Sequence, residues 1–150
     1  MRQRVMWGVV LIIVLLMIWG NSMLPGSISG TISSQTSKGI LSVLYQIVPN
    51  CLFDFNQFHS FIRKLAHFGE YALLGICSIQ FIKTYPTKHA LLYAFLFCLL
   101  CALIDEGIQV FTPNRLAKVS DSLLDSLGAA CGMLLCDFIQ RRKKHVSNGR

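Results

Sequence analysis

The chain has 150 residues, of which 53% are hydrophobic and only 14% are charged, and its mean hydropathy is +0.54. A soluble domain has about 25% charged residues, so this composition excludes a disordered chain, a disulfide scaffold and a cytosolic enzyme. The formal net charge is +7, but the cations flank apolar stretches, which indicates membrane topology rather than nucleic-acid binding. The sequence therefore predicts an all-α integral membrane protein with a single domain over residues 1–150.

Four apolar stretches are each long enough to cross a bilayer as a helix, which takes about 20 residues. The first has Trp7 and Trp19 near its ends, where interfacial aromatic residues are favoured. It looks like a signal peptide, but its apolar run exceeds the usual length of about 7–15 residues and no small-residue cleavage site follows it. We therefore expect an uncleaved first span in a bundle of four transmembrane helices, at residues 5–20, 63–82, 90–111 and 121–139.

The longest connection between these spans covers residues 21–62. Its first part, SISGTISSQTSKG, is rich in Ser, Thr and Gly and is typical of turns. Its second part, ILSVLYQIV, places Ile40, Leu44 and Ile47 at helical spacing, and Pro49 ends this pattern. This second part is expected to form either an interfacial helix on the outer membrane surface or a lid packed on the bundle.

The distribution of Lys and Arg indicates how the spans are oriented. With the amino terminus in the cytoplasm, nine of these cations face the cytoplasm and five face outwards. The block Arg141–Lys144 is a strong cytoplasmic anchor. We therefore expect both termini and the basic tail 140–150 in the cytoplasm, and the long loop 21–62 outside.

Polar and ionisable residues within the three later spans share helical faces. They are spaced at i, i+4 and i+7 on the second span, and at i and i+4 on the third and fourth. Because the second and fourth spans begin outside and the third ends there, all of them fall in the outer half of the bundle. Charged groups inside a membrane are costly and normally face a cavity, a partner or a functional path. The residues are Arg63, His67, Glu70, Asp105, Gln109, Asp121 and Asp125, and Glu106 lies next to Asp105 in the same half of the bundle.

This convergence suggests an acid–base site beside an anion-binding site. Several carboxylates in a low dielectric cannot all stay ionised, which suits general acid–base chemistry or proton transfer. Arg115, between the third and fourth spans, can close over the carboxylates or hold an anionic ligand with Arg63 and Lys64. The alternative is that buried ion pairs only hold helices together, and that Asp121 is only a helix N-cap. The candidate acids and bases are Glu70, Asp105, Glu106 and Asp125.

Other motifs predict packing rather than chemistry. His67 is a single histidine among acids, and no HExxH pair is present, so neither a metal ion nor another cofactor is expected. Five of the six cysteines fall within spans and are expected to pack there, whereas Cys51 lies in the outer loop. Gly128-xxx-Gly132 gives a small-residue surface, which is expected to pack within the bundle rather than form a dimer.

Four segments of the chain resemble, in order, the VanZ family of bacterial membrane proteins. They are WGNSMLPG, IRKLAHFGEYALLG, ALIDEGIQVFTPNR and SDSLLDSLGAACG. The resemblance implies a four-helix protein of the bacterial plasma membrane, in a family named for its link to resistance against teicoplanin, a lipid-bearing glycopeptide antibiotic. It adds Ser22 to the polar residues singled out above. The candidate ligand-binding residues are then Ser22, Arg63, Lys64, His67, Gln109, Arg115 and Asp121.

Three functions are open at this point. The first is an enzyme that acts on an anionic, lipid-linked envelope molecule, with cations holding phosphate or carboxylate and a carboxylate serving as acid or base. The second is a module that binds or shields such a molecule, or an amphiphilic antibiotic, without turnover. The third is a small proton-coupled transporter, which is less favoured because the sequence has no inverted repeat. The expected partners are membrane lipids and a lipid-linked cell-wall precursor or lipoglycopeptide, not nucleic acid.

Overall fold

Helices make up most of the computed structural model, which describes residues 1–48, 54–115 and 119–148, the side chains of 119 and 144–148 excepted. No strand occurs within these ranges. The predicted all-α fold is therefore confirmed. The helices are α1 (Arg2–Met23), α2 (Gly26–Ile47), α3 (Phe55–Ile82), α4 (Ala90–Phe111) and α5 (Val119–Asn148).

Four helices are long and apolar enough to cross a membrane, namely α1, α3, α4 and the Ser120–Lys143 part of α5. This agrees with the predicted spans in number and order. However, α3 begins at Phe55, well before the predicted start at residue 63. The Asp54 side chain caps it by accepting a hydrogen bond from the backbone N–H of Asn56 at 3.3 Å. Hydropathy missed these first turns because they include polar residues.

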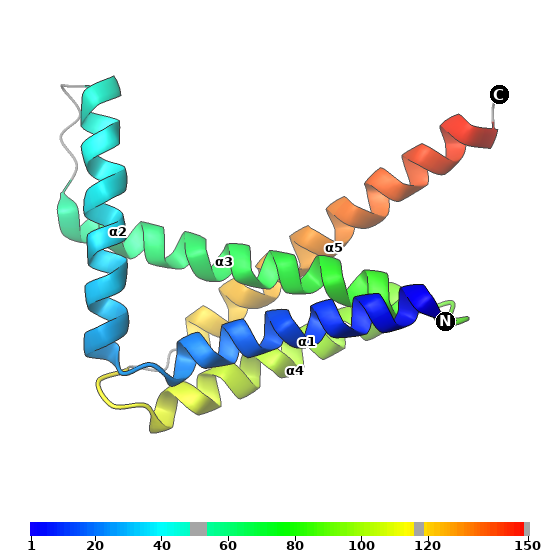
Figure 1. Ribbon diagram of the computed structural model, residues 1–150, viewed down its shortest axis with the longest axis horizontal. Helices are drawn as coiled ribbons and strands as arrows, with labels where there is room; N and C mark the ends of the chain where they lie inside the picture. Colours follow the sequence, from blue (N-terminus) through cyan, green and yellow to red (C-terminus); the bar gives the residue numbers. More distant parts are fainter. Residues whose placement is uncertain (49–53, 116–118, 149–150) are drawn as a thin grey trace.

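The segment between α1 and α3 differs from the expected turn-rich loop, because Gly26–Ile47 forms one continuous helix. Its Ser and Thr hydroxyls bond to carbonyls of the preceding turn, as Thr31 does to Ser27 at 2.8 Å, so a helix satisfies them as well as a turn does. Figure 1 shows α2 lying crosswise over one end of the other helices, and it packs on α3. The predicted outer helix is thus longer than expected. Pro49 and Cys51 lie outside the described residues.

The most extensive helix–helix packing joins α3 and α5 through small residues. A Cβ atom on Gly132 would collide with the backbone of Ala72, and one on Gly128 with the backbone of Phe68. Gly75 on α3 makes the reciprocal approach to the backbone of α5. The prediction that the small-residue stripe packs inside the bundle is therefore confirmed.

Mostly apolar side chains fill the core between the spans. Tyr71 is fully buried on α3, and its hydroxyl donates to the carbonyl of Cys101 on α4 at 3.3 Å. Cys77 and Cys98 are buried in the same core, whereas Cys131 is exposed. The cysteines described by the structure are all free thiols. Three of the predicted packing cysteines are therefore core residues.

The end opposite α2 is held by an ion network. Asp137 on α5 accepts from Lys83 Nζ and from Arg141 Nε, each at 2.7 Å. Beyond this network α5 continues as a helix to Asn148, away from the other helices, so residues 140–148 extend the last span rather than form a separate tail (Figure 1). Both termini lie on this side of the molecule (Figure 1).

Candidate functional site

The predicted polar residues come together at the end of the bundle that α2 covers, which we call the capped end (Figure 1). It is formed by the C-terminal ends of α1 and α4 and the N-terminal ends of α3 and α5. The residues lie in two layers. The buried layer is Ser22, Asp105, Glu106 and Asp125. The cavity layer, whose side chains line two cavities, is Arg63, Lys64, His67, Glu70, Gln109, Arg115 and Asp121.

A glutamine links the two layers. Gln109 Nε2 donates to Asp105 Oδ2 at 3.0 Å and lies 3.4 Å from Ser22 Oγ. Asp105 is 0% exposed and Asp125 is 1% exposed. One oxygen of each, Oδ1, has no hydrogen-bond partner among the described residues. Buried polar atoms nearly always have a hydrogen-bond partner, so two buried carboxylate oxygens without one are unusual for a protein interior. The structure places both carboxylates beneath the cavities, not in their walls.

Arg115 fastens the loop after α4 to the turn between α1 and α2. Its Nη2 donates to the carbonyl of Asn21 at 2.7 Å, and its Nε donates to the carbonyl of Leu24 at 3.3 Å. The backbone N–H of Gly26 also donates to the carbonyl of Pro113 at 3.0 Å. The predicted closing role of Arg115 thus takes a different form, because its described hydrogen bonds go to backbone carbonyls rather than to carboxylates.

Burial and the neighbouring Arg63 lower the pKa of Arg115 from its ordinary value. The carboxylates of Asp105 and Glu70 oppose this shift. A guanidinium stays protonated in proteins, so Arg115 remains a cation. The acids beneath it therefore favour the charged form of a half-buried arginine that also lines both cavities.

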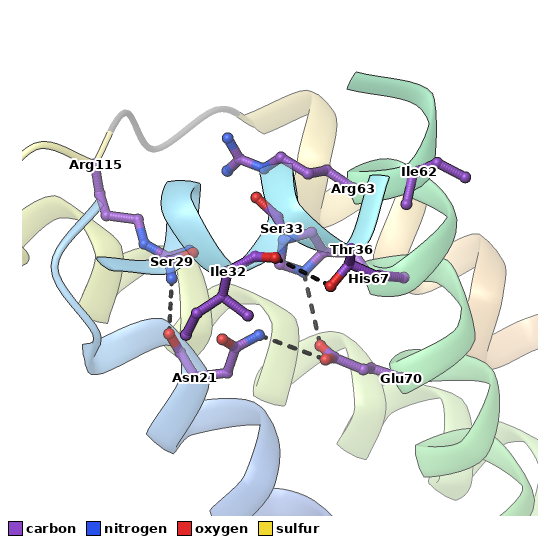
Figure 2. A pocket seen from close by; sticks show the side chains of 11 residues that line it. Asn21, Ser29, Ile32, Ser33, Thr36, Ile62, Arg63, His67, Glu70 and Arg115 are labelled. Carbon is purple, nitrogen blue, oxygen red and sulfur yellow. Dashed lines mark hydrogen bonds and ion pairs between the residues drawn. The ribbon is translucent and has the colours of Figure 1, made fainter. Parts of the chain in front are cut away.

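Two cavities open at the capped end, with volumes of about 200 and 290 Å³. The first lies under α2, whose Ser29, Ile32, Ser33 and Thr36 contribute to it (Figure 2). The second lies between α3, α5 and the loop after α4. The two linings have three residues in common, which are Arg63, His67 and Arg115.

Glu70 is the one candidate acid or base that lines a cavity in the described part of the chain. Figure 2 shows it facing Asn21 and His67. Its Oε1 accepts from Asn21 Nδ2 at 3.4 Å, and its Oε2 lies 3.9 Å from His67 Nδ1. The distance between Glu70 and His67 is too long for a hydrogen bond, so the Glu70 carboxylate is held loosely beside the cavity.

Two of the cations that line the cavities are exposed side chains. Arg63 and Lys64 are exposed, and neither takes part in an ion pair within residues 1–48, 54–115 and 119–148. Arg63 lines both cavities, whereas Lys64 and Asp121 line the second. An unpaired arginine beside a cavity is suited to binding phosphate or carboxylate through its planar fork of donors.

Part of the cavity wall is not predicted by the sequence pattern. Asn21 stands next to Ser22 in the WGNSMLPG segment, which is the one signal that points to it, and the α2 residues lie in a segment whose composition predicts turns. Among the described residues, no group of three or more His, Cys, Asp or Glu is arranged to hold a metal ion.

Comparison with known proteins identifies the family. The family model described as VanZ/LLP1 matches residues 8–140, which is most of the chain. No curated protein and no solved structure matches. The matched range includes most of the first and last candidate spans, the whole of the two between them and both layers of the capped end. The chain therefore belongs to the VanZ/LLP1 family of membrane proteins, which links it to antibiotic resistance.

Proposed function

We propose that this protein binds the anionic group of an amphiphilic cell-envelope molecule at the capped end, on the outer face of the bacterial plasma membrane. The observation that carries the proposal is the shared wall of the two cavities, Arg63, His67 and Arg115. Two guanidinium groups and an imidazole around one space favour an anion. The candidate ligands are a lipid-linked cell-wall precursor and the lipid-bearing glycopeptide itself.

The apolar part of the first cavity supports an amphiphile rather than a free anion. Ile32 of α2 and Ile62 and Ala66 of α3 line this cavity beside Arg63. The large apolar side chains of Phe61 and Leu65, on the same helix, are exposed. In a membrane such side chains contact lipid. A ligand that enters from the bilayer can therefore keep its chain on apolar residues while its anion reaches the cations.

A susceptibility assay tests this proposal. Wild type and Arg63→Gln are expressed in a teicoplanin-sensitive Gram-positive host, and membrane levels are compared by blot. We expect wild type to raise the inhibitory concentration and Arg63→Gln to lose most of this protection, because Arg63 lines both cavities. Lys38→Gln is the matched control, since Lys38 is an exposed cation on α2 that lines neither cavity. Full protection by Arg63→Gln at equal membrane level would contradict the proposal.

Acid–base chemistry at Glu70 is a second candidate function. It is favoured by one observation, that Glu70 lines the first cavity beside Arg63 and His67. Glu70→Gln separates the two functions, because an amide keeps the shape of the carboxyl group but cannot act as a general acid or base. Binding without turnover predicts that Glu70→Gln still protects, whereas catalysis predicts that it binds ligand but gives no protection.

A further inference from the structure

The two cavities have different linings. Apart from the shared wall of Arg63, His67 and Arg115, the first cavity includes the apolar Ile32 and Ile62. The second exposes much more polar surface than the first, although Gly26 and Leu124 also line it. Its further polar residues are Ser60, Lys64, Gln109, Asn114, Ser120 and Asp121. The cations thus stand at the boundary between a partly apolar space and a polar space.

The sequence of a partly apolar cavity, a cationic wall and a more polar cavity matches a ligand with three parts. An anion held by the shared wall would touch both cavities, because the same three side chains line them. The apolar chain would then leave through the first cavity. Whatever is attached to the other side of the anion would enter the second, whose volume of about 290 Å³ exceeds that of the first. A bare terminal phosphate would leave this second cavity empty.

Asp121 contributes a carboxylate to the wall of the second cavity. It lies in the first turn of α5, and its Oδ1 accepts a hydrogen bond from Ser120 Oγ at 3.1 Å. A carboxylate repels an anion but accepts hydrogen bonds strongly from hydroxyl groups. Its presence opposite Arg63 and Lys64 therefore suits a ligand that is anionic at the shared wall and donates hydrogen bonds beyond it.

We infer that the site selects a phosphodiester amphiphile whose headgroup carries hydroxyl groups, and that Asp121 recognises this headgroup. The inference rests on the proposed function and adds the substrate class to it. Arg63 and Arg115 hold the phosphodiester in this arrangement, and Asp121 accepts from a headgroup hydroxyl.

The test compares two lipids of equal charge and chain length. Dioctanoyl phosphatidylglycerol has two headgroup hydroxyls, and dioctanoyl phosphatidylmethanol has none. Each is titrated into the full chain in detergent, and bound lipid is counted by native mass spectrometry. We expect wild type to bind phosphatidylglycerol about tenfold more tightly than phosphatidylmethanol, because the free energy of one hydrogen bond to a charged group corresponds to that difference in affinity.

Three variants make the outcome decisive. Asp121→Ala should bring the two affinities together. Phosphatidylmethanol should bind at least as tightly as before, because the carboxylate that repels its phosphate is gone, and this binding also shows that the variant is folded. Asp54→Ala is the matched control, because Asp54 is another acid at a helix N-terminus and lines neither cavity. Arg63→Gln should weaken both lipids.

The failures of the two proposals are distinguishable. Equal binding of both lipids by wild type, with both weakened in Arg63→Gln, overturns the headgroup inference and leaves the anion site standing. A tenfold preference that persists in Asp121→Ala overturns the role of Asp121. Unchanged affinity of Arg63→Gln for both lipids overturns the proposed function itself.

Discussion

Arg115 joins two segments of the chain and still lines a cavity. Its guanidinium donates to the carbonyls of Asn21 and Leu24, which end α1, and it lies in the loop that leads from α4 to α5. The same side chain lines both cavities. The proposed binding of an anion and the closure of the capped end therefore depend on the same group.

Arg115→Lys should lower both stability and ligand affinity although it keeps the charge. A lysine ammonium is a single point and cannot replace two donors in a fixed fork. We expect a loss of about 1–3 kcal/mol in the free energy of unfolding, the usual worth of a hydrogen bond with a charged donor. Denaturant unfolding in detergent measures it, with Lys38→Gln as control. Wild-type stability in Arg115→Lys would show that charge alone suffices.

Among the elements, α3 and α5 depend on each other most. Their backbones approach so closely at Gly75, Gly128 and Gly132 that a methyl group does not fit. Apolar burial gives little net driving force between helices in lipid, so association relies on such close packing. The same contact aligns the N-terminal ends of both helices, which carry Arg63 and Asp121.

Gly132→Ala should therefore destabilise the protein by about 1–3 kcal/mol, as overpacking does elsewhere. Gly69→Ala provides the matched control, because nothing lies within 4 Å of a Cβ atom at Gly69. There the alanine should be neutral or stabilise by up to about 1 kcal/mol, since it is the better helix former. Thermal unfolding of both variants in the same detergent makes the comparison. Equal effects of the two substitutions would refute the packing argument.

Helix α2 packs on α3 much less extensively than α5 does. Ser37, which is fully buried, lies with its Oγ 3.0 Å from His59 Nδ1 of α3 and donates to the carbonyl of Ser33 at 2.8 Å. Ser37→Ala removes this link and leaves a partly buried imidazole nitrogen without its partner. We expect faster hydrogen–deuterium exchange across Gly26–Ile47, by about fivefold for a loss of ~1 kcal/mol. Ser42→Ala, at an exposed serine, should leave the exchange unchanged.

At the scale of the whole molecule, four candidate spans place both termini on the same side. The cations Lys83, Arg141 and Arg142 lie at that end, and the positive-inside rule predicts that it is cytoplasmic. With that orientation the capped end faces outwards, as the proposed envelope ligand requires.

Reporter fusions measure this orientation. Alkaline phosphatase, which is active only outside, should be active when fused after Ile47 and inactive when fused after Thr87. A fluorescent protein fused to the carboxyl terminus should fluoresce, since it folds in the cytoplasm. The opposite pattern would place the capped end in the cytoplasm and remove the argument for an envelope ligand.

The sequence by itself determined the all-α class, the number and order of the spans and the family, because bilayer thickness and apolar length dictate them directly. It also indicated which polar residues share a face, since helical spacing is local. Only the tertiary structure decided that Glu70 lines a cavity while Asp105 and Asp125 lie beneath it. Depth at the end of a bundle depends on how neighbouring helices pack and on what covers them. That cover is α2, whose Ser and Thr residues suit a helix or a turn equally until α3 packs against it.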